Sequence, residues 1–326
     1  MTRGDCVEGI HYGSIAVTDQ KGKVLFSVGD PDWQTFTRSS CKPLQAMPLL
    51  CHECFSELEL AQDEIAIMCG SHSGEPDHVK TVKNILDKIG LDEGYLCCGV
   101  HPPLYLDEMD KLPVEGETFT ALQHNCSGKH VGMLAQCKLL GVPADKYLAL
   151  DSPVQQGILS GISAFTGLEK DQIGVGIDGC SAPNFSLPLK VLASVYAQLA
   201  NPDEGSRFYG VCKLIYSAMT SHPFMVSGTQ RLDLLLMQTG NGDWLSKMGA
   251  EAVQCIGIGS RGWGIAIKII DGNTRAMKTV AVELLKQLHL LDDAKATLLG
   301  AHISSGINNH KGLKIGEIKP VFTLSY

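Results

Sequence analysis

Apolar and polar residues alternate near both ends of this chain with the two-residue period of a β-strand. Between residues 14 and 28, two alternating runs flank the polar stretch Asp19-Gln20-Lys21-Gly22, and this pattern predicts a β-hairpin. Near the other end, the runs 253–258 and 265–269 flank the turn-rich stretch Gly259-Ser260-Arg261-Gly262. We therefore expect a second hairpin there.

The middle of the chain carries the three- to four-residue period of helices instead. Gly, Pro, Asn or Asp bounds each helical segment, and these segments are 77–89, 153–165, 187–199, 205–221 and 229–237. After the second hairpin we expect a further helix over about 275–290 and a short strand near 313–318.

Strands at both ends of a helical interior predict the α+β class. We expect an antiparallel sheet from both chain ends, flanked by helices, together with a helical lobe. Residues 1–326 are expected to form a single catalytic unit. Its sheet lobe takes residues 1–60 and 245–326, and its mainly helical lobe takes residues 61–244. The cleft between the lobes is then the expected place for a site.

The charge balance argues against several classes of partner. The chain has 27 Lys and Arg against 35 Asp and Glu, a net charge of −8, so it lacks a broad basic surface for nucleic acid or an anionic membrane. No apolar run approaches the roughly 18 residues of a membrane span, and the first residues show no leader pattern. We expect a cytoplasmic protein whose 12 cysteines are mostly reduced thiols.

A Ser-x-x-Lys motif follows the first hairpin. Pro43 is tolerated only in the first turn of a helix, so the helix should begin near Ser39 or Ser40. Ser39 and Lys42 then lie one turn apart on the same face, where the amine can accept the hydroxyl proton. The alternative is an ordinary capping serine with a solvated lysine, since this spacing recurs by chance in many helices.

Two further stretches can contribute hydroxyl and amine groups. The polar run Ser71-His72-Ser73-Gly74-Glu75 lies between an apolar segment and a helix, where loops often carry function. A structural alternative is that Ser73 or Asp77 caps the helix. Lys247, two residues before Gly249, precedes the closing hairpin and can point its amine into a cleft. Its alternative is a surface turn.

Two thiols lie in glycine-flanked turns near histidines and a carboxylate. They belong to the strings His124-Asn125-Cys126-Ser127-Gly128-Lys129-His130 and Asp178-Gly179-Cys180-Ser181-Ala182-Pro183-Asn184. Such donors suit a soft metal in tetrahedral geometry, and zinc is the expected ion. From donor chemistry alone, His124 or His130 is the natural further ligand. Neither string has the repeated Cys-x-x-Cys spacing of a readable zinc site, so packing remains the alternative.

In their order along the chain, these motifs resemble the signatures of serine β-lactamases and penicillin-binding proteins. The strings themselves are more similar to the L-asparaginase II family, which differs from the threonine-nucleophile asparaginases. The resemblance spans about residues 10–320 and rests on these strings: Arg38-Ser39-Ser40-Cys41-Lys42-Pro43, Ser71-His72-Ser73-Gly74-Glu75, Asn125-Cys126-Ser127-Gly128-Lys129-His130, Asp178-Gly179-Cys180, His222-Pro223-Phe224-Met225-Val226-Ser227-Gly228 and Lys247-Met248-Gly249-Ala250-Glu251.

This resemblance implies a homodimeric, serine β-lactamase-like hydrolase that converts L-asparagine to L-aspartate and ammonia. It also implies two hydroxyl–amine pairs and a zinc site: Ser39 with Lys42, Ser71 with Lys247, and Cys126, Lys129 and Cys180 for the metal. The sequence departs from the family pattern at two positions. Ala252 stands where glycine is usual, and Phe224 stands where an acidic residue is common.

Amide hydrolysis needs an activated nucleophile, an oxyanion site and a proton donor for nitrogen. We hypothesise that Ser39 attacks the side-chain amide, that Lys42 takes its proton, and that water then releases aspartate from an acyl-enzyme. Lys42 must be neutral for this, so burial, Lys247, Arg38, zinc and the helix dipole are expected to lower its pKa.

Substrate contacts follow from charge complementarity alone. Arg38 is a candidate for the α-carboxylate and Asp178 for the α-ammonium, with His130 nearby. Zinc is expected to order the loop rather than to activate water, because Ser39 already supplies the nucleophile. Two rival functions remain: a Ser-Lys peptidase or lactam hydrolase, and a non-enzymatic zinc or thiol redox sensor.

Overall fold

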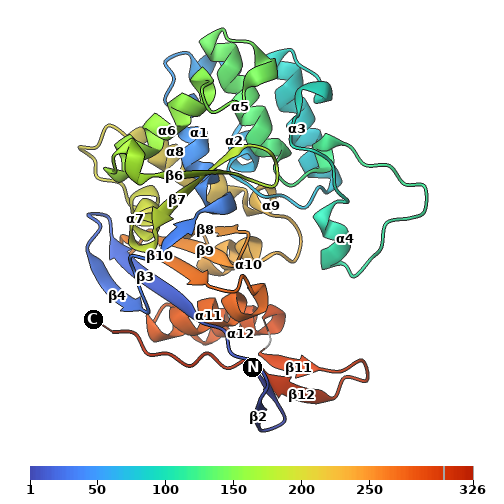
Figure 1. Cartoon of the computed structure of the whole chain (residues 1–326), viewed down its shortest axis with the longest axis vertical. Coiled ribbons are helices and arrows are strands. Elements are labelled where there is room, and N and C mark those ends of the chain that lie inside the picture. The colour runs from blue at the N-terminus through green and yellow to red at the C-terminus, as the bar shows by residue number, and fades with distance from the viewer. Residues whose placement is uncertain (304, 326) are drawn as a thin grey trace.

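In the computed structural model, which describes residues 1–303 and 305–325, strands from both chain ends meet beneath a group of helices (Figure 1). The strands are β1 (Thr2–Arg3), β2 (Cys6–Val7), β3 (Gly13–Asp19), β4 (Val24–Val28), β5 (Gln34–Phe36), β6 (Gly174–Ile177), β7 (Pro183–Pro188), β8 (Trp244–Gly249), β9 (Val253–Ile258), β10 (Trp263–Ile269), β11 (Gly306–Asn308) and β12 (Lys314–Glu317). The helices are α1 (Lys42–Leu50), α2 (Gln62–Met68), α3 (Pro76–Ile89), α4 (Leu104–Glu108), α5 (Ser127–Leu140), α6 (Pro153–Thr166), α7 (Leu189–Ala200), α8 (Tyr209–Ser221), α9 (Pro223–Val226), α10 (Leu232–Gly240), α11 (Thr274–Gln287) and α12 (Asp293–His302).

The central sheet has five strands in the order β4-β3-β10-β9-β8, and every neighbouring pair is antiparallel. The two expected hairpins are confirmed as β3–β4 and β9–β10, and β3 pairs directly with β10. The α+β prediction, with a sheet built from both chain ends, is therefore confirmed. Lys247 precedes the closing hairpin, as expected, and lies within a further strand, β8, at the edge of the sheet rather than in a surface turn.

The two faces of the sheet differ in the size of their side chains. On one face, Gly257 and Gly264 leave room for α7 to approach the backbone of β9 and β10. On the other face, Ile256 and Ile265 belong to the apolar cluster that includes residues of α11. Alternation along each strand thus separates a small-residue face, covered by α7, from a large-residue face, covered by α11.

Most expected helices are present with shifted ends. The segments 77–89, 153–165 and 275–290 correspond to α3, α6 and α11, and 187–199, 205–221 and 229–237 correspond to α7, α8 and α10. The longest helix that the pattern missed is α5. Its side chains from Ser127 to Cys137 are all buried, so no polar face marks it. None of the helices in the described ranges combines the length and apolar character of a membrane span.

A small second sheet, which the pattern also missed, leads the chain into the site. Its strands have the order β5-β7-β6, all antiparallel. At the end of β5, the Thr37 N–H donates to the Phe185 carbonyl (2.9 Å). This sheet therefore fixes where the Ser-x-x-Lys turn begins.

We expect Gly264→Ala to destabilise the fold by about 1–3 kcal/mol, the usual cost of overpacking. An added Cβ would lie 1.8 Å from the Ala193 carbonyl oxygen in α7, so the helix would have to move. Urea unfolding measures the free energy of unfolding. The matched control is Gly210→Ala in α8, where an added Cβ has no neighbour within 4 Å. Equal stability of the two variants would contradict the close approach of α7.

Candidate active site

The Ser-x-x-Lys segment forms a tight turn at the start of a helix, as expected. A 3₁₀ turn spans Arg38–Cys41 and continues into α1, with Pro43 in the first helical turn. The Lys42 N–H donates to the Ser39 carbonyl. Because side chains three residues apart eclipse in a 3₁₀ turn, Ser39 and Lys42 share one face.

This turn begins in an unusual backbone conformation. Arg38 has φ +50°, in the left-handed region that non-glycine residues rarely adopt. The side chain of Asn184 on β7 stabilises it, because its Oδ1 accepts from the Arg38 N–H (3.1 Å) and the Phe185 N–H (2.9 Å). The local sequence around Asn184 carries no signal for this contact, because its partners come from a distant segment and from its own neighbour.

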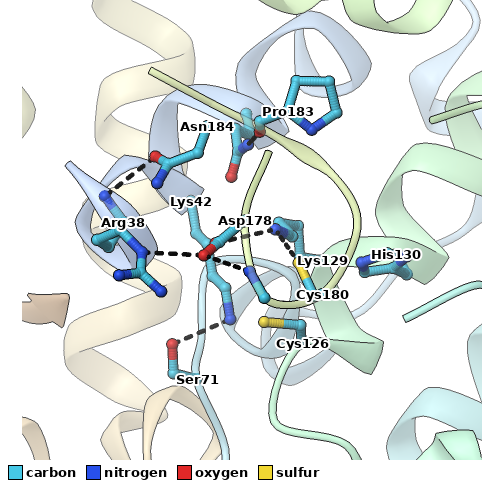
Figure 2. A network of polar contacts seen from close by, with 12 residues as sticks. Arg38, Lys42, Ser71, Cys126, Lys129, His130, Asp178, Cys180, Pro183 and Asn184 are labelled. Carbon is cyan, nitrogen blue, oxygen red and sulfur yellow. Dashed lines mark hydrogen bonds and ion pairs between the residues drawn. The ribbon is translucent and has the colours of Figure 1, made fainter. Parts of the chain in front are cut away.

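Lys42 is fully buried, and its amine has three partners at hydrogen-bond distance (Figure 2). They are the carbonyl oxygens of Gly70 (2.5 Å) and Asn125 (3.1 Å) and the Ser71 Oγ (2.9 Å). A neutral amine has two N–H donors and one lone pair. As an ammonium, Lys42 donates to all three; as a neutral amine it would donate to the two carbonyls and accept the Ser71 hydroxyl proton.

Electrostatics also favours the neutral form of this amine. Burial lowers the pKa of Lys42 below its ordinary value, and the nearby Lys129 adds to this effect. Cys126 and Cys180 oppose it. The balance favours an amine that gives up its proton more readily than a lysine in water.

The loop carrying Ser71 is held from several sides. The Ser71 N–H donates to the Val226 carbonyl (2.7 Å). The Nε2 of the adjacent residue, His72, lies 2.9 Å from the Ser127 Oγ. Neither Ser73 nor Asp77 caps the following helix, because the N-cap of α3 is Glu75. The Ser73 hydroxyl instead donates to the Ser227 carbonyl (2.7 Å).

The resemblance implied the pairs Ser39 with Lys42 and Ser71 with Lys247, and these stay predictions. Lys42 hydrogen-bonds to Ser71, and Lys247 pairs with the buried carboxylate of Asp233 (3.3 Å). Within the described ranges, the Ser39 hydroxyl has no hydrogen-bond partner. Asp233 was missed by the sequence analysis, although a single carboxylate inside the apolar run Leu232-Asp233-Leu234-Leu235-Leu236 was a visible signal.

The predicted zinc ligands do come together. Lys129 lies 2.9 Å from the Cys180 Sγ and 4.0 Å from the Asp178 Oδ2. A hydrogen bond from the Cys180 thiol holds the pKa of Cys126 well below its ordinary value, in spite of burial. Burial alone would lower the pKa of Lys129, but Cys126, Cys180 and Asp178 together raise it.

The donor set suits zinc, which binds sulfur and nitrogen. In the part of the chain that the structure describes, no three His, Cys, Asp or Glu side chains gather as a metal site. The set therefore depends on the Lys129 amine as its third donor. That amine would have to lose its proton to bind a metal, and it already contacts a thiol.

Of the predicted substrate contacts, Arg38 and Asp178 lie together and His130 lies apart. The Arg38 Nε donates to the Asp178 Oδ1 (2.9 Å). His130 is fully buried, and its Nδ1 lies 2.6 Å from the Tyr147 hydroxyl. In Figure 2 its ring is separated from Lys42 and Ser71.

Comparisons with known proteins agree with this arrangement of motifs. No curated protein matches the sequence. Two similar solved structures are Mglu in its native form (14% identity, 86% of this chain and 64% of Mglu covered, TM-score 0.48) and a β-lactamase-like protein from Bacteroides dorei DSM 17855 (12% identity, 84% and 93% covered, TM-score 0.42). The chain thus spans 64% of the length of Mglu. The family model of L-asparaginase II matches residues 1–320, so the chain belongs to the L-asparaginase II family.

Proposed function

We propose that this protein hydrolyses L-asparagine to L-aspartate and ammonia, with Ser39 as the nucleophile and Lys42 as the base. The observation that carries the proposal is the environment of the Lys42 amine. The amine is fully buried and has no carboxylate partner among the described residues, burial lowers its pKa, and its three partners can also serve a neutral amine. A buried neutral amine next to hydroxyl groups is what Ser-Lys catalysis requires.

Exposure supports Ser39, rather than Ser71, as the attacking group. Ser39 is half-buried and lies on the same face of the turn as Lys42, whereas Ser71 is only 3% exposed. Ser39 also lies where the 3₁₀ turn leads into α1. The N–H groups of Arg38, Ser40 and Lys42 already have partners, so the start of the helix would stabilise a developing oxyanion through its positive potential.

The reaction then takes two steps. Ser39 Oγ attacks the carboxamide carbon while Lys42 takes the hydroxyl proton, and the tetrahedral adduct collapses to an ester as ammonia leaves. The proton reaches the leaving nitrogen from Lys42 through the Ser71 hydroxyl, to which the amine is hydrogen-bonded. Water attacks the ester in the second step, and Lys42 again takes a proton, so that aspartate leaves and the Ser39 hydroxyl is restored.

The ion pair between Arg38 and Asp178 supports an amino-acid substrate. Asparagine carries a carboxylate and an ammonium on its α-carbon, and these complement a guanidinium and a carboxylate that already lie 2.9 Å apart. We assign Arg38 to the α-carboxylate and Asp178 to the α-ammonium. His130 is buried on a different side, so its predicted part in substrate binding stays a prediction.

We also propose that Cys126, Lys129 and Cys180 hold a zinc ion. Bound there, the ion would supply fixed positive charge and would tie the start of α5 to the loop of Cys180. Asn125 precedes Cys126, and its carbonyl is a partner of Lys42. The metal is thus expected to order the Lys42 environment rather than to act on the substrate.

The assembly and location implied by the resemblance are also proposals. We propose a homodimer in the cytoplasm, each chain being one catalytic unit with a sheet lobe (1–60 and 245–326) and a mainly helical lobe (61–244). Size-exclusion chromatography with light scattering tests the dimer.

We expect the purified protein to release ammonia from L-asparagine and to leave a chromogenic lactam intact. Ser39→Ala and Lys42→Met should each lower kcat by about a thousandfold or more, since nucleophile and base act as one unit. Ser71→Ala should lower kcat by about tenfold to a hundredfold, the usual range for a proton-transfer group. An enzyme-coupled ammonia assay measures all three.

Ser40→Ala is the matched control for this series. Ser40 is the neighbour of Ser39, but its hydroxyl donates to the Thr37 carbonyl (2.6 Å), away from the amine. We expect it to retain activity. Mass spectrometry of the protein quenched during turnover should locate the acyl group on Ser39, and a label on Ser71 would exchange the two roles. Hydrolysis of the lactam without ammonia release from asparagine would refute the substrate.

For the metal, we expect Cys126→Ser and Cys180→Ser each to remove bound zinc, measured by inductively coupled plasma mass spectrometry. Loss of a ligand that binds only the folded state should lower the melting temperature, by about 5 °C or more. Cys137→Ser is the control, because Cys137 is also buried in α5 but is not part of the cluster. If a chelator abolished turnover and left KM unchanged, the ordering role would be wrong.

A further inference from the structure

A carboxylate that the proposed reaction does not use lies fully buried behind the site. Asp233 is in the first turn of α10 and has no exposed surface. It accepts hydrogen bonds from the Ser246 hydroxyl (2.7 Å) and the Met248 N–H (2.9 Å), both in β8, and from the Gln254 side-chain amide (3.2 Å) in β9. Its fourth partner is the Lys247 amine (3.3 Å).

Burial of both charges makes this pair costly for the fold. Lys247 and Asp233 each have 0% exposed side chain. Removing two charges from water carries a large desolvation penalty, and apolar residues of similar volume often serve stability as well or better. The other residues of α10 are mostly apolar. Packing alone therefore does not account for a charged pair at this place.

The position of Lys247 supplies that explanation. Its amine donates to the Met248 carbonyl (2.8 Å) as well as to Asp233, so it is held at the edge strand of the sheet. Three charged neighbours change the pKa of Lys247: Asp233 and Arg231 at α10, and Lys42 in α1. Lys247 in turn lowers the pKa of two thiols, Cys69 after α2 and Cys255 in β9.

The charge of Lys247 depends on one carboxylate. The pKa of Lys247 is lowered to about 8: burial is the largest cause, Lys42 and Arg231 act in the same direction, and Asp233 alone among these charged neighbours opposes the shift. Burial would also raise the pKa of Asp233, but Lys247 and the three hydrogen-bond donors hold it below its ordinary value. Each ion of the pair thus keeps the other charged.

We propose that Asp233 is a positioning residue for the hydrolysis: its carboxylate holds Lys247 in place as an ammonium ion and so maintains a fixed positive charge on β8, the strand whose Gly249 lies against the Thr37 carbonyl at the start of the Ser39 turn. The inference rests on the proposed function, because it gives Lys247 a part in that reaction. It adds a carboxylate partner, Asp233, to the implied pairing of Lys247 with Ser71.

The test is the pH profile of ammonia release by Asp233→Asn, which removes the charge and keeps the shape. Without the carboxylate, Lys247 loses its proton at lower pH, so we expect the alkaline fall in kcat to begin about one pH unit or more lower than in the wild type. At pH 7.5 we expect kcat to fall about tenfold, with KM little changed. A merely structural role would reduce the folded fraction and leave the alkaline fall where it is.

Ser246→Ala is the matched control. It removes one neutral donor from the same carboxylate and keeps the ion pair, so the alkaline fall should not move. The double variant Asp233→Asn/Lys247→Met should have the activity of Lys247→Met alone, because Asp233 acts only through Lys247. A further loss of activity in the double variant, or an unmoved profile in Asp233→Asn, would overturn the proposal.

Melting temperatures separate this inference from the proposed function. Asp233→Asn leaves a buried ammonium without its partner, so the double variant should melt at a higher temperature than Asp233→Asn. If Asp233→Asn fails to fold but the double variant folds, the same conclusion holds. Failure of both to fold, or additive losses in melting temperature, would show that Asp233 serves the fold alone. A wild type that releases no ammonia from asparagine would refute the function without altering this comparison.

Discussion

The burial of one lysine amine between two backbone carbonyls is the constraint on which the site depends. Lys42 enters from α1, the Gly70 carbonyl comes from the end of α2, and the Asn125 carbonyl comes from the turn before α5. Three separate parts of the helical region must therefore be in place before the amine has its partners. The hydrogen bonds of the amine therefore depend on how these helices pack together.

A second buried lysine completes the charge arrangement from the sheet side. Lys247 comes from β8 and is paired with a carboxylate of α10, whereas Lys42 is paired with no carboxylate in the described chain. The two amines compete for a proton, because a positive charge on Lys42 lowers the pKa of Lys247. The one with a carboxylate partner is the better place for a proton, and the one held by carbonyls is the better base. The division of roles between two identical side chains thus follows from their surroundings.

The sequence pattern correctly predicted the elements that are determined by residues close together in the chain. The hairpins, the amphipathic helices and the helix start at Pro43 follow from the period of apolar residues and from proline geometry. The helix α5 was missed because burial on all sides removes the period, and the short strands of β5-β7-β6 carry too little pattern to detect. The partners of Lys42 and Lys247 come from segments distant in sequence, so no spacing rule could pair them. The resemblance, rather than the pattern, indicated that Cys126, Lys129 and Cys180 meet.

The pairing of β3 with β10 has a consequence for how the protein folds during its synthesis. Asp19 lies opposite Trp263 in the sheet. The strand β3 therefore cannot pair with β10 until β10, which is much later in the sequence, has been synthesised. Contacts this distant in sequence form slowly, and an unpaired strand edge invites association with other chains. During synthesis the edge of β3 that pairs with β10 stays unpaired until residues 263–269 have been made.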